Sequence, residues 1–215
     1  MILDPNLTAA YLVIATALAL TPGPDVLFVV ANGMRHKVRG AIASALGIGF
    51  GSVLHALAAA LGISALIAAS PVAFDALRYA GAAYLTFLGY KALRSWWAYS
   101  NDLNTKNAPV EASARNVFLR GLITNILNPK VVVFYLALLP QFVSVELGNV
   151  GMQIFLLGCI HNAIGIIYLI CIGLAAGTAS GWLARTSFGK WMDGIAGVFF
   201  IGLAVRLALS GRPEN

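Results

Sequence analysis

Six apolar runs occupy almost the whole of this chain and constrain its fold more than any other feature. A hydrocarbon core about 30 Å thick takes roughly 20 helical residues to cross, and each run approaches or exceeds that length. A helix also satisfies its own backbone hydrogen bonds, which lipid cannot do. The sequence therefore predicts an all-α integral membrane protein with six transmembrane helices, at 7–32, 41–69, 72–93, 117–140, 150–177 and 191–209.

The composition excludes the common soluble classes. Hydrophobic residues make up 60% of the chain and charged residues only 10%, whereas a soluble domain usually carries about 25% charged residues. The net charge of +6 is attributed to loop Lys and Arg that set the topology, so the expected partner is the lipid bilayer and no nucleic acid. Cys159 and Cys171 share one apolar run and are interpreted as small buried hydrophobes. No Cys/His metal spacing occurs, and no cofactor is predicted.

A polar linker at 98–116 divides this single membrane domain into two halves of three helices each, at 1–97 and 117–215. Lys and Arg are concentrated on the linker side of the helices, ten against three, with Lys130 left out because it lies inside a span. The positive-inside rule then places the linker in the cytoplasm and both termini outside. Because each half crosses the membrane an odd number of times, the halves are predicted to form a 3+3 inverted-topology repeat, an architecture common among membrane transporters.

The first and fourth predicted helices carry matching interruptions, which supports the repeat. Pro22 and Pro24 remove two backbone donors, and Gly23 between them adds freedom, so no α-helix passes through undisturbed. Pro129 interrupts the fourth helix and frees a carbonyl one turn back, near Asn125. Irregular backbone at membrane depth is tolerated only inside protein or beside a wet cavity. We therefore expect the two breaks to face one another across a cavity.

A charged residue follows each break, namely Asp25 and Lys130. Each lies ten residues from an inner-surface marker, Arg35 or Arg120, and ten helical residues span roughly 15 Å, about half the hydrocarbon core. A charge at mid-membrane costs roughly 2.5–3.5 kcal/mol on insertion scales and is functional by default. We predict that both residues belong to a substrate or coupling site. The alternative is a structural ion pair that joins the first helix to the fourth.

The groups around the breaks suit a small zwitterionic substrate. Lys130 and the helix N-termini would hold its carboxylate, whereas Asp25 and freed carbonyls would hold its ammonium group. The side chains of Asn125 and Asn128 offer further donors and acceptors.

Two histidines, His55 and His161, lie in the middle of the second and fifth predicted helices, at matching positions of the two halves. Histidine has the side chain whose unperturbed pKa lies nearest neutrality, so each would serve to relay protons. The alternative for each is a buried neutral histidine bonded to a backbone carbonyl.

Motifs spread over nearly the whole chain carry a family resemblance. They are Thr21-Pro22-Gly23-Pro24-Asp25, the segment 40–62, Gly81-Ala82-Ala83-Tyr84-Leu85 with Leu88-Gly89, Phe118-Leu119-Arg120-Gly121, Asn125-Ile126-Leu127-Asn128-Pro129-Lys130 and Leu139-Pro140-Gln141-Phe142. Together they resemble the bacterial lysine exporter and homoserine/threonine resistance translocators, the LysE/RhtB type. The chain departs from many relatives at Ser52, where they carry an acidic residue.

The resemblance implies a secondary transporter that exports amino acids or close derivatives across the bacterial cytoplasmic membrane. It implies antiport driven by a proton or cation gradient, without ATP hydrolysis, and leaves the substrate and a possible homodimer open. A metal-ion exporter or a channel-like pore remains the alternative. An intramembrane enzyme is not expected, because Asp25 lacks a second facing aspartate and Ser52 and His55 share one helix.

Overall fold

The structure is a computed structural model, and it describes residues 2–69, 71–97, 113–178 and 188–209. Every regular element within these ranges is helical, so the all-α prediction is confirmed for them. The elements are α1 (Pro5–Leu20), α2 (Pro24–Ala69), α3 (Pro71–Trp97), α4 (Ala114–Ile126), α5 (Pro129–Val133), the π-helical turn η1 (Phe134–Leu138), the 3₁₀ turn η2 (Leu139–Phe142), α6 (Val150–Thr178) and α8 (Phe188–Leu209).

Some of these helices begin earlier in the chain than expected, because local caps set their first turns. Asp4 accepts a 2.9 Å hydrogen bond from the Leu7 amide at the start of α1. Ser113 accepts one of 3.3 Å from the Asn116 amide, so α4 starts inside the predicted linker. The rest of that linker, 98–112, lies outside the described residues. The start of α8 at Phe188 likewise precedes the predicted start at residue 191.

The expected loop after the first membrane helix is reduced to one residue, Lys37, whose φ of 54° interrupts α2. Val29, before Lys37, and Ala41, after it, both lie against Gly173 of α6. The chain therefore turns back at Lys37. The Lys37 ammonium donates a 3.1 Å hydrogen bond to the Gly177 carbonyl near the end of α6. α2 is therefore a hairpin of two antiparallel helical segments.

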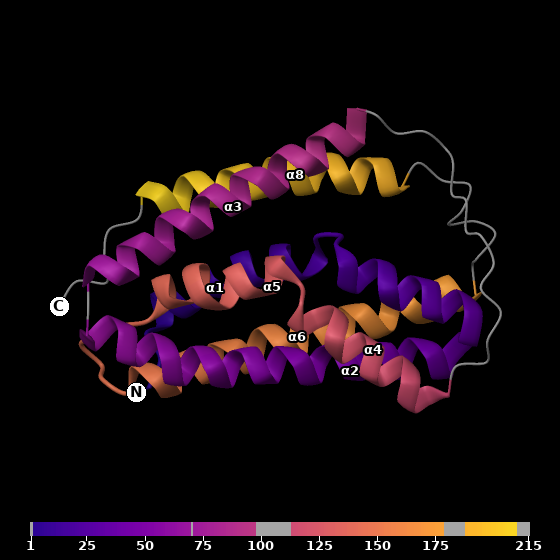
Figure 1. The fold of residues 1–215 in the computed structure, drawn as a ribbon, viewed down its shortest axis with the longest axis horizontal. Coiled ribbons are helices and arrows are strands. Elements are labelled where there is room, and N and C mark those ends of the chain that lie inside the picture. Colours follow the sequence, from indigo (N-terminus) through magenta and orange to yellow (C-terminus); the bar gives the residue numbers. More distant parts are fainter. Residues whose placement is uncertain (1, 70, 98–112, 179–187, 210–215) are drawn as a thin grey trace.

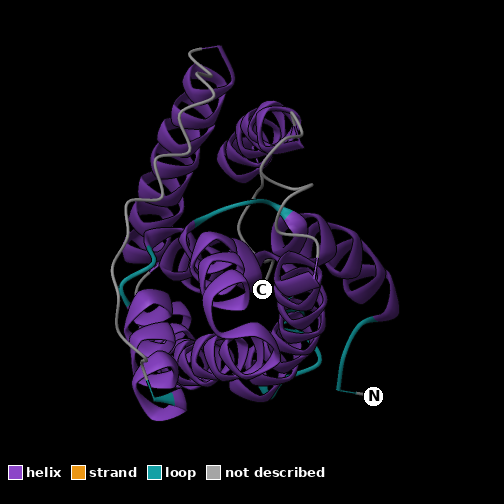
Figure 2. Cartoon of the chain, turned by 90° about the vertical axis from the view of Figure 1, so that its right-hand side faces the viewer, coloured by secondary structure: helices purple, strands orange, loops and turns teal. Residues whose placement is uncertain are grey.

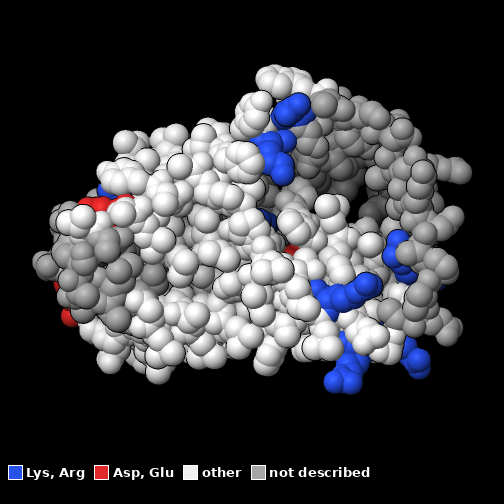
Figure 3. Space-filling view, viewed as in Figure 1, with Lys and Arg blue, Asp and Glu red and all other residues white. Residues whose placement is uncertain are grey.

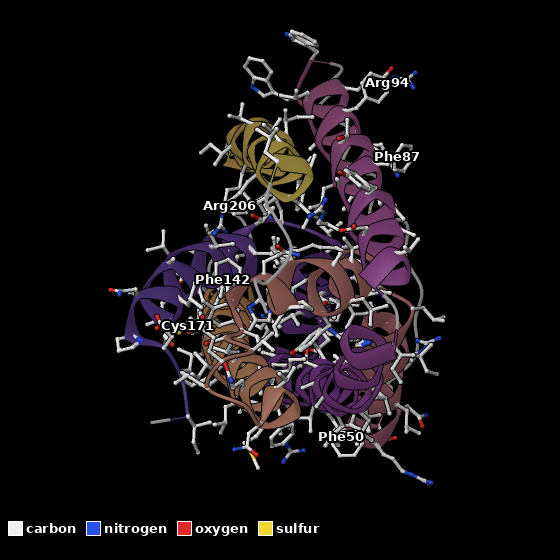
Figure 4. The ribbon with its side chains drawn as sticks, turned by 90° about the vertical axis from the view of Figure 1, so that its left-hand side faces the viewer. Phe50, Phe87, Arg94, Phe142, Cys171 and Arg206 are labelled. Carbon is white, nitrogen blue, oxygen red and sulfur yellow. The ribbon has the colours of Figure 1, made fainter. Side chains whose placement is uncertain are left out.

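The helices form layers along the long axis of the molecule (Figure 1). α3 and α8 pack side by side in the upper layer, α1, α5 and the first segment of α2 lie in the middle, and the second segment of α2 lies below with α4 and α6. Seen end-on, the α3–α8 pair stands apart from the cluster of other helices (Figure 2). One tie between the layers is Arg206 of α8, whose guanidinium lies 4.6 Å from the centre of the Phe142 ring (Figure 4).

Small residues allow the lower helices to approach closely. A Cβ on Gly47 of α2 would lie 2.1 Å from the Phe118 carbonyl oxygen of α4, and one on Gly33 would lie 2.2 Å from the Gly173 carbonyl oxygen of α6. The expectation that both cysteines are buried is wrong for Cys171, which is exposed on α6 (Figure 4). An outward-facing thiol on an apolar helix is compatible with a lipid neighbour.

Among the described residues, two helices are long and apolar enough to cross a membrane: Pro24–Gly62 and Val150–Thr178. A third is obtained if Ala114–Ile126 and Pro129–Phe142, bent by 50° at their junction, are taken as one span. The first of these includes the Lys37 reversal, so it is folded rather than straight. Six spans and the 3+3 repeat therefore stay predictions.

The two ends of the molecule differ in charge. α1 begins and α8 ends at one end of the molecule (Figure 1), whereas the Lys and Arg side chains visible in Figure 3 gather mainly toward the other half. α2 turns back and α4 begins at this second end. Positively charged side chains are thus concentrated toward one end of the long axis of the molecule.

Candidate functional site

The first interruption, between α1 and α2, is three residues long and follows from proline chemistry. α1 ends at Leu20, Thr21 is extended with φ −68° and ψ 127°, and Pro24 opens α2. Pro24 has no amide to donate, so the Leu20 carbonyl loses its helical partner. The Tyr168 hydroxyl of α6 donates to that carbonyl over 3.3 Å. The break is therefore satisfied by protein, as a membrane interior requires.

The second interruption lies at 127–128, between α4 and α5. Pro129 opens α5, and the Asn128 side chain caps it by accepting a 3.1 Å hydrogen bond from the Lys130 amide. The carbonyl freed by Pro129 is that of Asn125, as predicted; it accepts from the Asn128 amide at 3.0 Å and lies 3.4 Å from Nε2 of His55. Because a carbonyl only accepts, His55 donates there when Nε2 carries the proton.

The irregular residues of the two breaks are 21–23 and 127–128, and Asp25 and Lys130 follow them, as expected. Proline favours the first turn of a helix, so the charged residue that follows it becomes part of the new helix. The two charges therefore sit in the first turns of α2 and α5 rather than in irregular backbone.

Each charged side chain bonds to a residue at the opposite break: Asp25 to Asn125, just before the second break, and Lys130 to Thr21, the first residue of the first break. The Asn125 amide of α4 donates to Asp25 Oδ2 over 2.9 Å. The Lys130 ammonium donates to the Thr21 carbonyl over 2.8 Å. A Cβ on Gly23 would lie only 3.6 Å from Lys130 Cδ, so the lysine stem crosses the first break at its glycine. These reciprocal contacts hold the two interruptions together.

Asp25 and Lys130 do not form a salt bridge, since no nitrogen–oxygen pair between them lies within 4.0 Å. The hypothesis of a direct ion pair joining the two helices is therefore wrong for this conformation. Asp25 Oδ1 is buried and has no hydrogen-bond partner among the described residues. A buried, unsatisfied carboxylate oxygen is costly unless something else bonds to it.

A cavity of about 50 Å³ lies beside both breaks. It sits where two apolar clusters meet, one containing Leu18 and Val131 and the other containing Val26, Ile48 and Leu169. The polar and small residues on its wall come from both halves of the chain, and they are Gly23, Asp25, Ser52, Asn125, Asn128, Lys130, His161, Asn162 and Gly165. The expected juxtaposition of the two breaks across a cavity is thus present.

The two histidines occupy unequal places despite their matching positions in sequence. His161 lines the cavity, and its buried Nδ1 has no partner among the described residues. His55 lies behind Asn125 and stacks on the Tyr135 ring at 5.7 Å. The residues that line the cavity include His161 but not His55.

Three polar residues of the site were not predicted to belong to it. Ser52 is buried and lies 3.4 Å from the Asn125 side-chain oxygen. Asn162 lines the cavity beside His161, and Tyr168 bonds to the first break. Ser52 lies three residues before His55 and Tyr168 lies seven after His161, and both spacings place a pair on one helical face. That spacing is the sequence signal that would have identified Ser52 and Tyr168.

Comparison with known proteins places this architecture in a family. Residues 16–211 match the model of the LysE type translocators. The uncharacterized membrane protein YrhP of Bacillus subtilis is 30% identical over 206 residues, covering 94% of this chain and 98% of YrhP. The leucine efflux protein of Enterobacter sp. (strain 638) is 31% identical over 199 residues, covering 92% of this chain and 93% of the relative.

A second leucine efflux protein, from Salmonella typhimurium, is 32% identical over 200 residues, with 92% of each chain covered. No solved structure matches the chain. The family consists of translocators, so the prediction of a membrane transporter rather than an enzyme is confirmed. This chain, with its two proline-interrupted helices around a charged cavity, belongs to the LysE type translocator family.

Proposed function

We propose that this protein is a secondary transporter that exports small zwitterionic amino acids with aliphatic side chains through the cavity between its two helix breaks. The observation that carries the proposal is the convergence of Asp25, Lys130 and Asn125 on one cavity with an apolar wall. The names of the two leucine efflux relatives support the substrate class. We place the protein in the bacterial cytoplasmic membrane.

In the proposed substrate pose, one oxygen of Asp25 and the ammonium group of Lys130 bind the charged groups of the amino acid. Asp25 Oδ1 is buried without a partner and accepts from the substrate ammonium. Lys130 exchanges its bond to the Thr21 carbonyl for the substrate carboxylate. The unpaired amides at the start of α2 add a weaker attraction for an anion. The aliphatic side chain then lies against Ile48, Ile166 and Leu169.

The observed conformation is closed around this site. Its cavity of about 50 Å³ is well below the roughly 300–1,000 Å³ typical of ligand pockets. Binding therefore requires the two breaks to separate, and the 50° bend between α4 and α5 is the natural hinge. Two hydrogen bonds between the halves would break in that step: the one from Asn125 to Asp25 and the one from Lys130 to Thr21.

The proposed topology has six spans, with the Lys- and Arg-rich end in the cytoplasm and both termini outside. Elements that would correspond in an inverted repeat also pack on each other: α2 packs along α6, and α3 along α8. This pairing supports a two-fold relation between 1–97 and 117–215. We attribute coupling to a proton or cation gradient, with His161, which lines the cavity, as a proton-accepting group.

The proposal is tested by efflux from proteoliposomes preloaded with radiolabelled leucine, alanine or lysine, with and without an imposed pH gradient. We expect leucine and alanine efflux to exceed that of empty liposomes and of the Asp25→Asn protein, and to respond to the gradient. Gradient-independent flux of all three, lysine included, would indicate a pore. The metal-ion alternative has no cluster of three His, Cys, Asp or Glu within the described residues, and a divalent-cation tracer in the same assay tests it directly.

A further inference from the structure

Gly165 of α6 lies on the wall of the cavity described above. We infer that Gly165 determines the largest substrate side chain that the transporter accepts, because the space above it is where that side chain lies. This inference rests on the proposed amino-acid transport and assigns one of its specificity determinants.

Of the five glycines in α6, Gly158, Gly165 and Gly173 follow one another at the spacing of one helical face, and two of these three have a packing reason. A Cβ on Gly158 would lie 2.7 Å from Ala56 Cβ, and one on Gly173 would lie 2.7 Å from Val29 Cγ1. A Cβ on Gly165, between them, would meet no heavy atom within 4 Å. Glycine is disfavoured inside a helix relative to alanine, so close packing explains the outer two and leaves Gly165 without a structural cause.

The direction of Gly165 follows from the helical repeat. Its neighbours His161, Asn162, Ile166 and Leu169 all line the cavity. Successive residues of an α-helix are rotated by about 100°, so these four positions bound one arc of α6 and position 165 falls inside that arc. A side chain at 165 therefore extends into the cavity and not toward a neighbouring helix.

The wall around Gly165 is suited to an apolar side chain. Asp25, Asn125 and Lys130 gather at the two breaks and would hold the charged groups of an amino acid. The aliphatic part of the wall consists of Leu18, Ala19, Val26, Ile48, Val131, Ile166 and Leu169, and its other polar residues are Ser52, Asn128, His161 and Asn162. With the charged groups fixed at the breaks, the substrate side chain lies along this wall, where the missing Cβ of Gly165 leaves room.

The test compares Gly165→Ala and Gly165→Val with the wild type in efflux from proteoliposomes loaded with alanine or leucine. Gly202→Val on α8 is the matched control, because a Cβ at Gly202 also meets nothing within 4 Å but this residue does not line the cavity. Both valine substitutions change the intrinsic helix propensity by the same amount. Thermal stability of all variants is measured in parallel, so that loss of folding is separated from loss of transport.

We expect Gly165→Val to lower the leucine-to-alanine efflux ratio by about tenfold or more, as one or two methyl groups do in an apolar pocket. Gly165→Ala should shift the ratio in the same direction by less, and it decides the question if the valine variant does not fold. An unchanged ratio in the folded Gly165 variants, or an equal change in Gly202→Val, overturns the inference and leaves the proposed function standing. A wild type that moves no amino acid overturns the proposed function, and the inference with it.

Discussion

The side-chain amide of Asn125 donates a 2.9 Å hydrogen bond to the carboxylate of Asp25, which lies 100 residues earlier in the chain. The contact joins the end of α4 to the start of α2, so one interrupted helix supplies the partner for the charge on the other. Its counterpart is the 2.8 Å bond from Lys130 to the Thr21 carbonyl. The two contacts together hold the interrupted helices against each other.

Replacing Asn125 should both destabilise the protein and stop transport. In Asn125→Leu the number and branching of the side-chain heavy atoms are kept, but Asp25 loses the donor to Oδ2. We expect the free energy of unfolding to fall by about 1–3 kcal/mol, the usual result when a buried group is left unsatisfied. Asn32→Leu is the control, because the Asn32 amide bonds only to the Phe28 carbonyl of its own helix. Thermal unfolding in detergent measures both, and equal losses would contradict the special role of Asn125.

Removing both charges should not restore the transport that is lost when one charge is removed. Asp25 and Lys130 bond to different partners, so Asp25→Asn and Lys130→Gln each break a separate contact. We expect efflux to be abolished in each single variant and in the double variant. A direct ion pair would behave differently, because deleting both members leaves no orphan charge. A double variant that transports better than either single variant would revive the ion-pair hypothesis. Lys91→Gln, at an exposed position, controls for charge alone.

Joining α1 to α2 should stop transport without unfolding the protein. In an uninterrupted helix the Thr21 carbonyl would accept from the Asp25 amide and would be lost to Lys130. We therefore expect the double substitution Pro22→Ala with Pro24→Ala to keep or raise the thermal unfolding temperature while lowering efflux at least about tenfold, the effect of roughly 1.4 kcal/mol. Pro5→Ala, at the start of α1, is the matched control and should retain transport. Unaltered efflux in the double variant would show that the break is dispensable.

Adding a methyl group to Gly33 should be strongly destabilising. Its Cβ would lie 2.2 Å from the Gly173 carbonyl oxygen, and backbone of both helices would have to move apart. Overpacking of this kind costs about 1–3 kcal/mol. Gly62→Ala should be neutral or stabilising, since a Cβ there meets nothing within 4 Å. Similar unfolding temperatures for Gly33→Ala and Gly62→Ala would mean that α2 and α6 are not in the described contact.

The two histidines should differ in their effect on coupling. His161 lines the cavity, whereas His55 contacts the Asn125 carbonyl behind it. We expect His161→Gln to remove most of the response of efflux to an imposed pH gradient. His55→Gln keeps an amide that donates to the same carbonyl and should retain that response. The measurement is the ratio of efflux with and without the gradient, and an equal loss in both variants would argue against a distinct role for His161.

Much of the site was predictable from local sequence, because proline acts on the backbone next to it. Pro24 and Pro129 lack an amide hydrogen, so an interruption before each of them follows from covalent chemistry alone. The freed carbonyl at Asn125 was predicted for the same reason and accepts from the Asn128 amide. The positions of the apolar runs likewise follow from residue type, since a helix needs no partner to satisfy its own hydrogen bonds.

Other features depended on which helices pack together, and local sequence does not carry that information. Nothing in the sequence around Asp25 indicates that Asn125 is its partner, and nothing around Lys130 indicates the Thr21 carbonyl. The alternative of a direct ion pair between Asp25 and Lys130 is not met in this conformation, because each charge bonds to a separate partner, an amide for Asp25 and a carbonyl for Lys130. The sequence alone thus determined where the helices break and which residues carry charge, and the tertiary structure decided their partners, because partners are set by long-range contacts between helices.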